Sequence, residues 1–228
     1  HMVSATRAEI LGECEASLVR LGVERIALYQ MHWPVPQPVD EVARACADLL
    51  AAGKIGAIGV SNVSVAQLDA WLATGLPLHC LQAPYSILRP ASAETVLPWC
   101  EAHGLGAIAY SSLFRGMLFG TWKADKTFPA GDSRGEHKDY HGPRFQRHLQ
   151  AIDELRAIAA ADDLTVPQLA IGALMGTPGL TGCIVGARNA AQGAALGELG
   201  MPLNAKQLAA VETTMARLVA DLANLTDA

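Results

Sequence analysis

The sequence is poor in charged and in aromatic side chains. Asp, Glu, Lys and Arg make up only 17% of its 228 residues and aromatic residues only 5%, whereas 51% are hydrophobic. The 17 basic residues are fewer than the 22 acidic ones, so the formal net charge at pH 7 is -5. Without an excess of Lys and Arg there is no stripe of phosphate contacts, and we expect no nucleic-acid partner. The high apolar content is typical of a globular domain and excludes a disordered chain.

Long apolar runs and targeting signals are also missing. No apolar run comes near the ~20 residues that a membrane-spanning helix needs, so we expect no membrane partner. No charged-then-apolar leader opens the sequence, and we expect a cytoplasmic protein. His1 and Met2 are typical of a cloning remnant, and the chain length predicts one domain over residues 1–228.

Cysteine is scarce and follows no motif. The five cysteines are odd in number and widely spaced, and no Cys-x-x-Cys occurs. We therefore expect buried, reduced thiols and no disulfide framework. His137 and His141 stand four residues apart but lack the adjoining Glu of a zinc-protease motif, so we also expect no metal site.

The sequence does contain a repeated alternation of short apolar runs and amphipathic stretches. In the first run, apolar residues lead to His32 and Trp33, and Pro34 then stops regular structure. Five runs of this kind end in polar residues or glycine, at 25–32, 55–62, 79–85, 106–113 and 182–187. Helical spacing is found at 6–21, 39–52, from 64 or 65 onward, and at 93–102, 145–161, 166–176 and 208–222. This alternation predicts a parallel sheet with outer helices and right-handed crossovers.

The ends of the predicted strands carry the chemistry. Polar groups that converge at the carboxyl ends of parallel strands mark the active face of such a sheet. A polar segment rich in Gly and Pro, residues 120–143, interrupts the alternation and is too long for a plain connection. We call it the rim loop, and we expect Trp122, Arg134 and Tyr140 within it to shape a substrate site.

At these strand ends the sequence resembles the aldo-keto reductase superfamily. The resemblance covers about residues 17–208 and follows the family order. It is carried by Leu-Tyr-Gln-Met-His-Trp-Pro (28–34), Gly-Lys-Ile-Gly-Ala-Ile-Gly-Val-Ser-Asn (53–62), Gln-Ala-Pro-Tyr-Ser (82–86), Ala-Tyr-Ser-Ser-Leu-Phe-Arg-Gly (109–116) and Ile-Val-Gly-Ala-Arg-Asn-Ala-Ala-Gln (184–192). The resemblance implies a (β/α)8 barrel that binds a nicotinamide cofactor, usually NADPH, at the C-terminal face.

The resemblance also implies roles for individual residues. His32 matches the active-site histidine that orients and polarises the substrate carbonyl, and Trp33 would contact the substrate. Ten further positions match contacts to the nicotinamide carboxamide, the nicotinamide ring, the pyrophosphate and the adenosine 2′-phosphate. In that order they are Ser61, Asn62 and Gln82; Tyr85; Ser111, Leu113 and Gly116; and Gly186, Arg188 and Gln192.

Two departures from the family pattern change these expectations. Only five strand–helix units occur, so we expect an incomplete TIM-type barrel of α/β class that lacks the first three units. In the family those units carry the proton-donating Tyr, its Lys and a supporting Asp, and no residue before Arg25 offers a Tyr or Lys. Residues 193–196 replace the acidic and Asn pair that the family uses against adenine, so the adenine end of NADP(H) should be held less well.

Each assignment has a structural alternative. His32 could be a histidine hydrogen-bonded in the barrel mouth, and Ser61 and Asn62 could cap the following helix. Tyr85 could pack in the core, and Arg188 could be a solvated charge.

Three functional hypotheses follow from the resemblance and the departures. The first is NADP(H)-dependent reduction of a small carbonyl compound without the family's own proton donor. The second is a non-redox enzyme, such as a lyase, dehydratase, cyclase or isomerase, with His32 as general acid or base. The third is a non-catalytic binding relative. Because the open edge of a sheet invites pairing, we also expect a homodimer or higher oligomer that covers the barrel gap.

Overall fold

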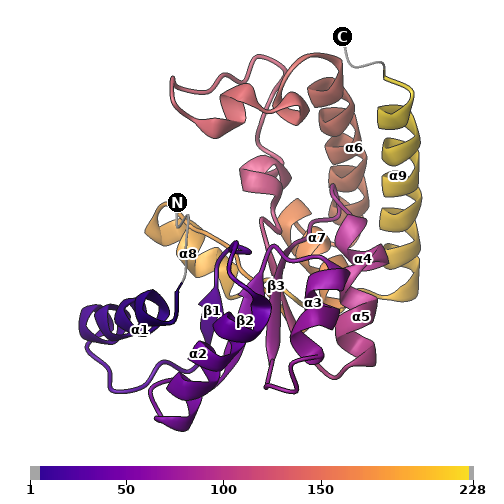
Figure 1. Ribbon diagram of the computed structural model, residues 1–228. Helices are drawn as coiled ribbons and strands as arrows, with labels where there is room; N and C mark the ends of the chain where they lie inside the picture. Colours follow the sequence, from indigo (N-terminus) through magenta and orange to yellow (C-terminus); the bar gives the residue numbers. More distant parts are fainter. Residues whose placement is uncertain (1–5, 226–228) are drawn as a thin grey trace. The chain divides into compact units, whose positions relative to one another are not determined.

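The computed structural model describes residues 6–225, and the proposed cloning remnant at residues 1–2 lies outside them. The chain forms two compact units (Figure 1). Unit 1 draws its described residues from His1–Pro84, Ala91–Tyr110 and Pro178–Gly182. Unit 2 consists of Tyr85–Pro90, Ser111–Thr177 and the described part of Cys183–Ala228. The single domain predicted from chain length stays a prediction.

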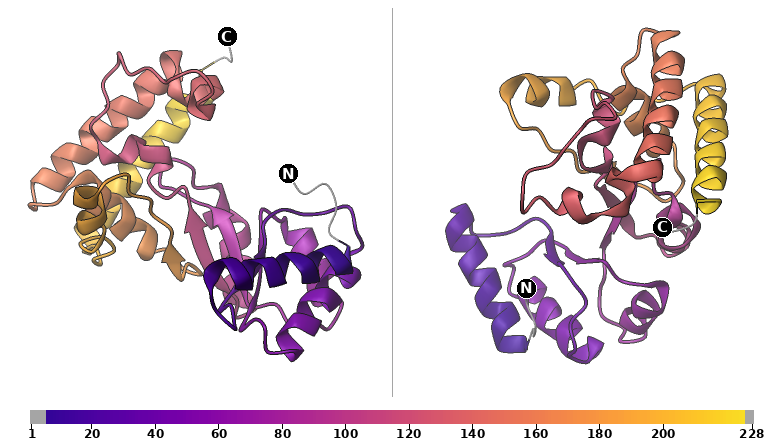
Figure 2. Two further views of the ribbon diagram at one scale, coloured as in Figure 1. Left: turned by 90° about the vertical axis from the view of Figure 1, so that its left-hand side faces the viewer. Right: turned by 90° about the horizontal axis from the view of Figure 1, so that it is seen from above.

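Unit 1 holds the parallel sheet, which confirms the predicted strands (Figure 2). The strands are β1 (Tyr29–Met31), β2 (Ile58–Ser61), β3 (Cys80–Pro84), β4 (Gly106–Tyr110) and β5 (Gly182–Cys183), which begins in this unit. They lie in chain order, and β1–β2, β2–β3 and β3–β4 pair in parallel. Each strand is shorter than its apolar run. Among the extra residues of the first two runs, Ile26 and Ile55 form an isolated parallel bridge.

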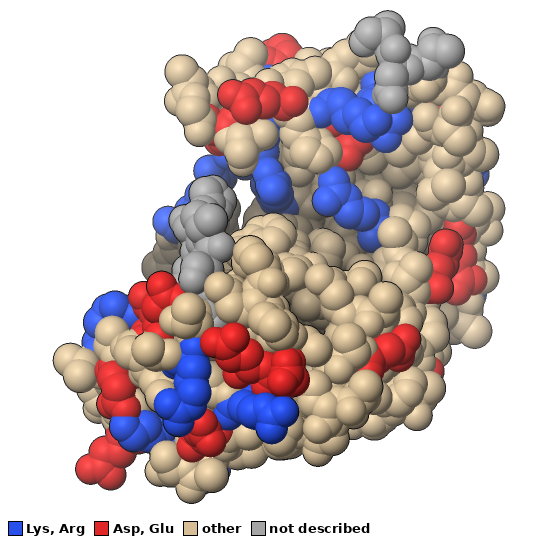
Figure 3. Space-filling view, in the orientation of Figure 1, with Lys and Arg blue, Asp and Glu red and all other residues tan. Residues whose placement is uncertain are grey.

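Besides the sheet, unit 1 contains five helices. They are α1 (Arg7–Leu21), α2 (Val39–Ala51), α3 (Val65–Leu72), α4 (Ala91–Glu94) and α5 (Val96–Ala102). Thr6 and Glu9 form a capping box at the start of α1, and Gly22 ends it in the left-handed conformation. α1 lies beside α2, and Figure 3 shows acidic and basic side chains interleaved over these two helices. Two of the ion pairs there are Arg7–Asp48 and Lys54–Glu15.

The helix predicted at 93–102 is in fact two helices. α4 ends at Glu94, and α5 begins at Val96 after Thr95, whose φ and ψ are -125° and -83°. Pro98 explains the break, because a continuous helix would set its ring against the carbonyl group of Glu94. Inside α5, Pro98 lies in the first turn, where no intrahelical partner is lost.

Unit 2 contains the remaining helices. These are the 3-10 turns η1 (Phe114–Phe119), η2 (Ser133–Glu136) and η3 (Lys138–Tyr140), and the helices α6 (Gly142–Ala160), α7 (Val166–Met175), α8 (Ala190–Leu196) and α9 (Ala205–Ala223). α6 and α9 lie side by side (Figure 1). The rim loop therefore contains two short 3-10 turns. α8 was not predicted, because its Ala and Gly residues show no apolar periodicity.

The core of each unit is apolar. Ile55, Ile58 and Leu81 are fully buried in unit 1, as are Leu155 and Leu169 in unit 2. Four of the five free cysteines are buried and the fifth is half-buried, which agrees with the expected reduced thiols. Within residues 6–225, no helix combines the length and apolar character needed to cross a membrane.

Candidate functional site

His32 follows the last residue of β1 and has an exposed side chain. Its imidazole stacks on the indole of Trp33, with the ring centres 5.7 Å apart and the planes 19° from parallel. The backbone oxygen of His32 accepts a hydrogen bond of 2.9 Å from Nδ2 of Asn62. The end of β1 is thus fixed by a side chain from the end of β2, and the exposed imidazole is in contact with the Trp33 ring.

Asn62 connects three strand ends of unit 1. Its backbone is left-handed, with φ of 60°, a conformation that Asn adopts more readily than most residues. Its Nδ2 donates to the backbone oxygen of His32 and to Oγ of Ser61, at 2.9 and 3.1 Å. Its Oδ1 accepts a 2.6 Å hydrogen bond from the phenol of Tyr110, the last residue of β4. The side-chain amide of Asn62 therefore holds the ends of β1, β2 and β4 together.

Ser61 and Asn62 do not cap the helix that follows β2. Ser64 caps α3, and its side chain accepts from the backbone nitrogen of Gln67 while Gln67 bonds back to Ser64. Ser61 is 3% exposed and donates to the backbone oxygen of Gln82 at 3.0 Å. The capping alternative is wrong, and Ser61 instead links β2 to β3.

Tyr85 belongs to unit 2 and is packed inside it. It is 7% exposed, and its phenol lies 2.9 Å from Oγ1 of Thr177. Burial raises the pKa of the Tyr85 phenol above its ordinary value. The hydrogen bond to Thr177 and the low exposure both support the core-packing alternative for this tyrosine.

One cavity of unit 2 collects the predicted phosphate-end residues. Its volume is about 460 Å³. Six residues singled out from the sequence line it, namely Ser111, Leu113, Gly116, Gly186, Arg188 and Gln192. The cavity also contains Arg115, Arg134 and Trp122. Of the three guanidinium groups around this cavity, that of Arg134 is paired with Asp132, and those of Arg115 and Arg188 suit an anionic ligand with phosphate oxygens.

The turn that lines this cavity has an unusual backbone. Ser111, Arg115 and Gly116 have φ of 56°, 50° and 101°, and the backbone nitrogens of Phe114 and Gly116 donate within the turn, to the oxygens of Ser111 and Leu113. On the other side of the cavity, Oε1 of Gln192 accepts from the backbone nitrogen of Arg188 at 2.8 Å. Gln192 thereby fixes the backbone of Arg188, whose side chain is exposed.

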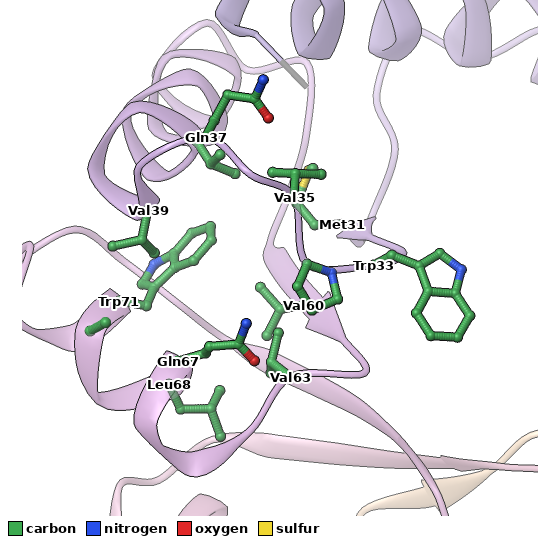
Figure 4. A pocket seen from close by; sticks show the side chains of 13 residues that line it. Met31, Trp33, Val35, Gln37, Val39, Val60, Val63, Gln67, Leu68 and Trp71 are labelled. Atoms are coloured by element: carbon green, nitrogen blue, oxygen red, sulfur yellow. The ribbon is translucent and has the colours of Figure 1, made fainter. Parts of the chain in front are cut away.

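A second, apolar pocket lies in unit 1 between the helix layer and the ends of β1 and β2 (Figure 4). It has a volume of about 150 Å³, and no ionisable side chain is among its lining residues. Trp71 stands beside Val39 in it, and the indole nitrogen of Trp71 already donates to the backbone oxygen of Pro77 at 3.2 Å. Trp33 also borders this pocket. The pocket offers packing surface but no group for acid–base chemistry.

The sequence reasoning missed two residues of these sites. Tyr110 is the last residue of its strand and polar, which is the same signal that pointed to His32 and Ser61. Arg115 lies inside the motif at 109–116, where nothing in the sequence distinguishes it from the other residues of the loop. Among residues 6–225, no group of three or more His, Cys, Asp or Glu side chains is arranged to hold a metal ion.

Comparison with known proteins places this geometry in a family. A family model described as "Aldo/keto reductase family" matches residues 1–215. The chain is 37% identical to "Aldo-keto reductase YhdN" of Bacillus subtilis (strain 168), over 95% of this chain and 66% of the relative. It is 31% identical to the "NADH-specific methylglyoxal reductase" of Escherichia coli (strain K12), over 77% of this chain and 54% of the relative.

A solved structure agrees with these relatives. The glycerol dehydrogenase AKR11B4 from Gluconobacter oxydans superposes with a TM-score of 0.89 at 34% identity, covering 97% of this chain and 67% of that one. The chain thus spans between about half and two thirds of the length of the proteins that it matches.

Proposed function

The chain belongs to the aldo/keto reductase family, and on this premise we propose that it acts in the NADP(H)-dependent reduction of a small carbonyl compound. The main support is one cavity of unit 2, which is lined by all six residues predicted for the phosphate half of the cofactor. The six residues come from two motifs, at 109–116 and 184–192. Residues from two motifs so far apart in the sequence would not be expected to line one cavity by chance.

The residues present fit a dinucleotide phosphate. Arg188 and Arg115 supply guanidinium donors, and Ser111 at the start of the left-handed turn supplies a hydroxyl donor. In unit 1, Ser61, Asn62 and Gln82 are the residues proposed for the carboxamide, with Tyr110 holding the Asn62 amide in place. When bound, the nicotinamide would supply a hydride to the carbonyl carbon of the substrate.

His32 is the residue proposed to act on the substrate. An imidazole can donate a hydrogen bond to the carbonyl oxygen and can transfer a proton to the oxygen as hydride arrives at carbon. The Asn62 bond to the backbone of His32 holds the strand end in register, and stacking on Trp33 restricts the ring. We propose Trp33, with about half of its surface exposed, as a wall of the substrate site.

One observation favours a second candidate, non-redox catalysis at the same strand ends. The observation is the exposed His32 directly after β1, whose imidazole can give or take a proton without a cofactor. With His32 as general acid or base, a lyase, dehydratase, cyclase or isomerase reaction needs no hydride donor.

A fluorescence titration of the 228-residue chain with NADPH, and in parallel with NADH, separates the two candidates. Saturable binding of NADPH supports the reductase, and its absence contradicts it. Because the E. coli relative is named for NADH and methylglyoxal, NADH and methylglyoxal belong in the test beside NADPH. The weakened adenine contact at residues 193–196 leads us to expect micromolar or weaker affinity, about 1 µM or above.

We also propose that the chain forms a homodimer or higher oligomer. β1 lies at the edge of the sheet, and Val19, Leu21 and Val23 in the segment before it are 81%, 63% and 44% exposed. An unpaired strand edge next to apolar side chains favours association. Light scattering tests this proposal, and a monodisperse monomer would contradict it.

A further inference from the structure

The turn that follows β4 contains an unbroken left-handed run. Phe114, Arg115 and Gly116 have φ of 48°, 50° and 101°. The left-handed region is readily adopted by Gly but disfavoured for residues that carry a Cβ. Two non-glycine residues in succession therefore need contacts that hold them there.

The rim loop supplies these contacts. Nη1 of Arg134 donates to the backbone oxygen of Arg115 at 3.0 Å, and the phenol of Tyr140 donates to the backbone oxygen of Phe114 at 3.3 Å. In return, Nη1 of Arg115 donates to Oγ of Ser133 at 3.0 Å. Both carbonyl groups of the disfavoured residues thus accept a hydrogen bond from the rim loop.

Arg134 is itself held in one orientation. Its Nε donates to Oδ1 of Asp132 at 2.9 Å and its Nη2 to Oδ2 at 2.5 Å, a paired arrangement that matches the planar guanidinium. The guanidinium also lies over the rings of Phe128 and Trp122, 4.9 and 5.7 Å from their centres. A lysine has no planar fork and could not bond Asp132 twice while also reaching the Arg115 oxygen.

We propose that Arg134 is a positioning residue for phosphate binding. It holds residues 114–116 in the left-handed form, so that Arg115 and Gly116 are already in place at the wall of the unit 2 cavity before any ligand arrives. Because Arg134 and Trp122 also line the cavity, a bound phosphate in turn orders the rim loop. This inference rests on the proposed function, since the phosphate is the pyrophosphate of the nicotinamide cofactor.

The first test needs no ligand. The backbone nitrogens of Gly116 and Leu118 both donate to the oxygen of Leu113, at 3.0 and 3.2 Å, so their hydrogen exchange reports on the turn. In R134Q both amides should exchange about tenfold faster than in the wild-type chain. R147Q is the matched control, because Arg147 is an exposed residue of α6 bonded to Gln150. Equal exchange in R134Q and wild type would overturn the inference.

The second test uses NADPH and compares charge with geometry. R134Q and R134K should both raise the Kd about tenfold, because both lose the fork, whereas R147Q should leave the Kd unchanged. A wild-type Kd in R134K would show that charge alone matters and would overturn the positioning role.

A double variant tests whether Arg134 acts through the turn. In R115G the left-handed conformation is no longer disfavoured at residue 115, so R134Q should raise the Kd less in this background than in wild type. Equal fold-changes in the two backgrounds would overturn the inference. If the wild-type chain binds no NADPH, the proposed function fails, while the exchange experiment still decides whether Arg134 holds the turn.

Discussion

The phenol of Tyr110 donates to the side-chain oxygen of Asn62 across 2.6 Å, and this bond joins the end of β4 to the end of β2. The same amide bonds the backbone of His32 through its nitrogen. One asparagine side chain therefore joins the strand end that carries His32 to β4, the strand that precedes the turn proposed to bind phosphate. The two residues are 48 positions apart in the sequence.

Tyr110→Phe should weaken cofactor binding without unfolding the sheet. The variant keeps the ring but removes the donor, so Asn62 is free to turn away from the carboxamide. We expect a Kd for NADPH about fivefold higher, measured by fluorescence titration, which is the effect of one ordinary hydrogen bond. Tyr29→Phe in β1 is the control and should leave the Kd unchanged. An unaltered Kd in Tyr110→Phe would show that Asn62 does not contact the cofactor.

His32→Gln should abolish most turnover but not cofactor binding. Glutamine can still donate a hydrogen bond but cannot transfer a proton, and general acid catalysis contributes roughly 10²–10⁴ in rate. We expect kcat to fall within that range while the Kd for NADPH stays at its wild-type value. Stopped-flow or steady-state assays with methylglyoxal and NADPH measure the first quantity. Full activity in His32→Gln would assign the histidine a structural role.

Asp139→Asn should destabilise unit 2 at neutral pH. The Asp139 side chain is 11% exposed and pairs with Arg144 at 3.0 Å, and His148 lies 3.5 Å away. Burial by itself would raise the pKa of Asp139, but the neighbouring His148 and Arg144 side chains outweigh it and hold the pKa below its usual range. Loss of the charge should lower the free energy of unfolding by about 2–3 kcal/mol at pH 7, measured with denaturant.

The pH dependence of this loss has a definite sign. A carboxyl group with a lowered pKa in the folded state stabilises above its unfolded pKa of about 3.9, and this contribution is lost as pH falls toward the folded pKa. The difference between wild type and Asp139→Asn should therefore be constant above about pH 5 and shrink below about pH 4. Asp125→Asn, at an exposed site of the rim loop, should show no difference at either pH. If the stability difference between wild type and Asp139→Asn persisted at low pH, it would not come from the charge of Asp139.

Gly179→Ala should destabilise unit 1, and Gly12→Ala should not. Gly179 has φ of 79°, and a Cβ there would collide with the carbonyl group of Leu97, whose carbon lies 3.0 Å away. The strain and the collision together should cost about 2–4 kcal/mol of unfolding free energy. Gly12 is inside α1 with open space around its Cβ position, so alanine should stabilise by about 0.5–1 kcal/mol. Thermal and denaturant unfolding measure the stability of both variants. A Gly179→Ala variant as stable as the wild type would contradict the close contact between Gly179 and Leu97.

The sequence predicted the presence of the helices and strands better than the residues at which they begin and end. The local sequence predicts a helix start at Thr6, which forms the capping box with Glu9. The strand–helix alternation predicts all five strands. The predicted strands are longer than the observed ones. An apolar run indicates only that its residues are buried, whereas a residue belongs to a strand only if its backbone is hydrogen-bonded to a neighbouring strand. The break at Thr95 could have been foreseen from Pro98, whereas α8 could not, since its small residues show no period.

By itself, the sequence determined the parallel architecture, the family and the polar strand ends, because these depend on periodicity and on residues close together in the chain. Only the tertiary structure decided which of those ends are joined. The bond between Asn62 and Tyr110, the support of Arg115 by Arg134, and the packing of Tyr85 against Thr177 each join residues far apart in sequence. No local pattern encodes such pairs, because the distances between them are set by how the strands and the rim loop pack.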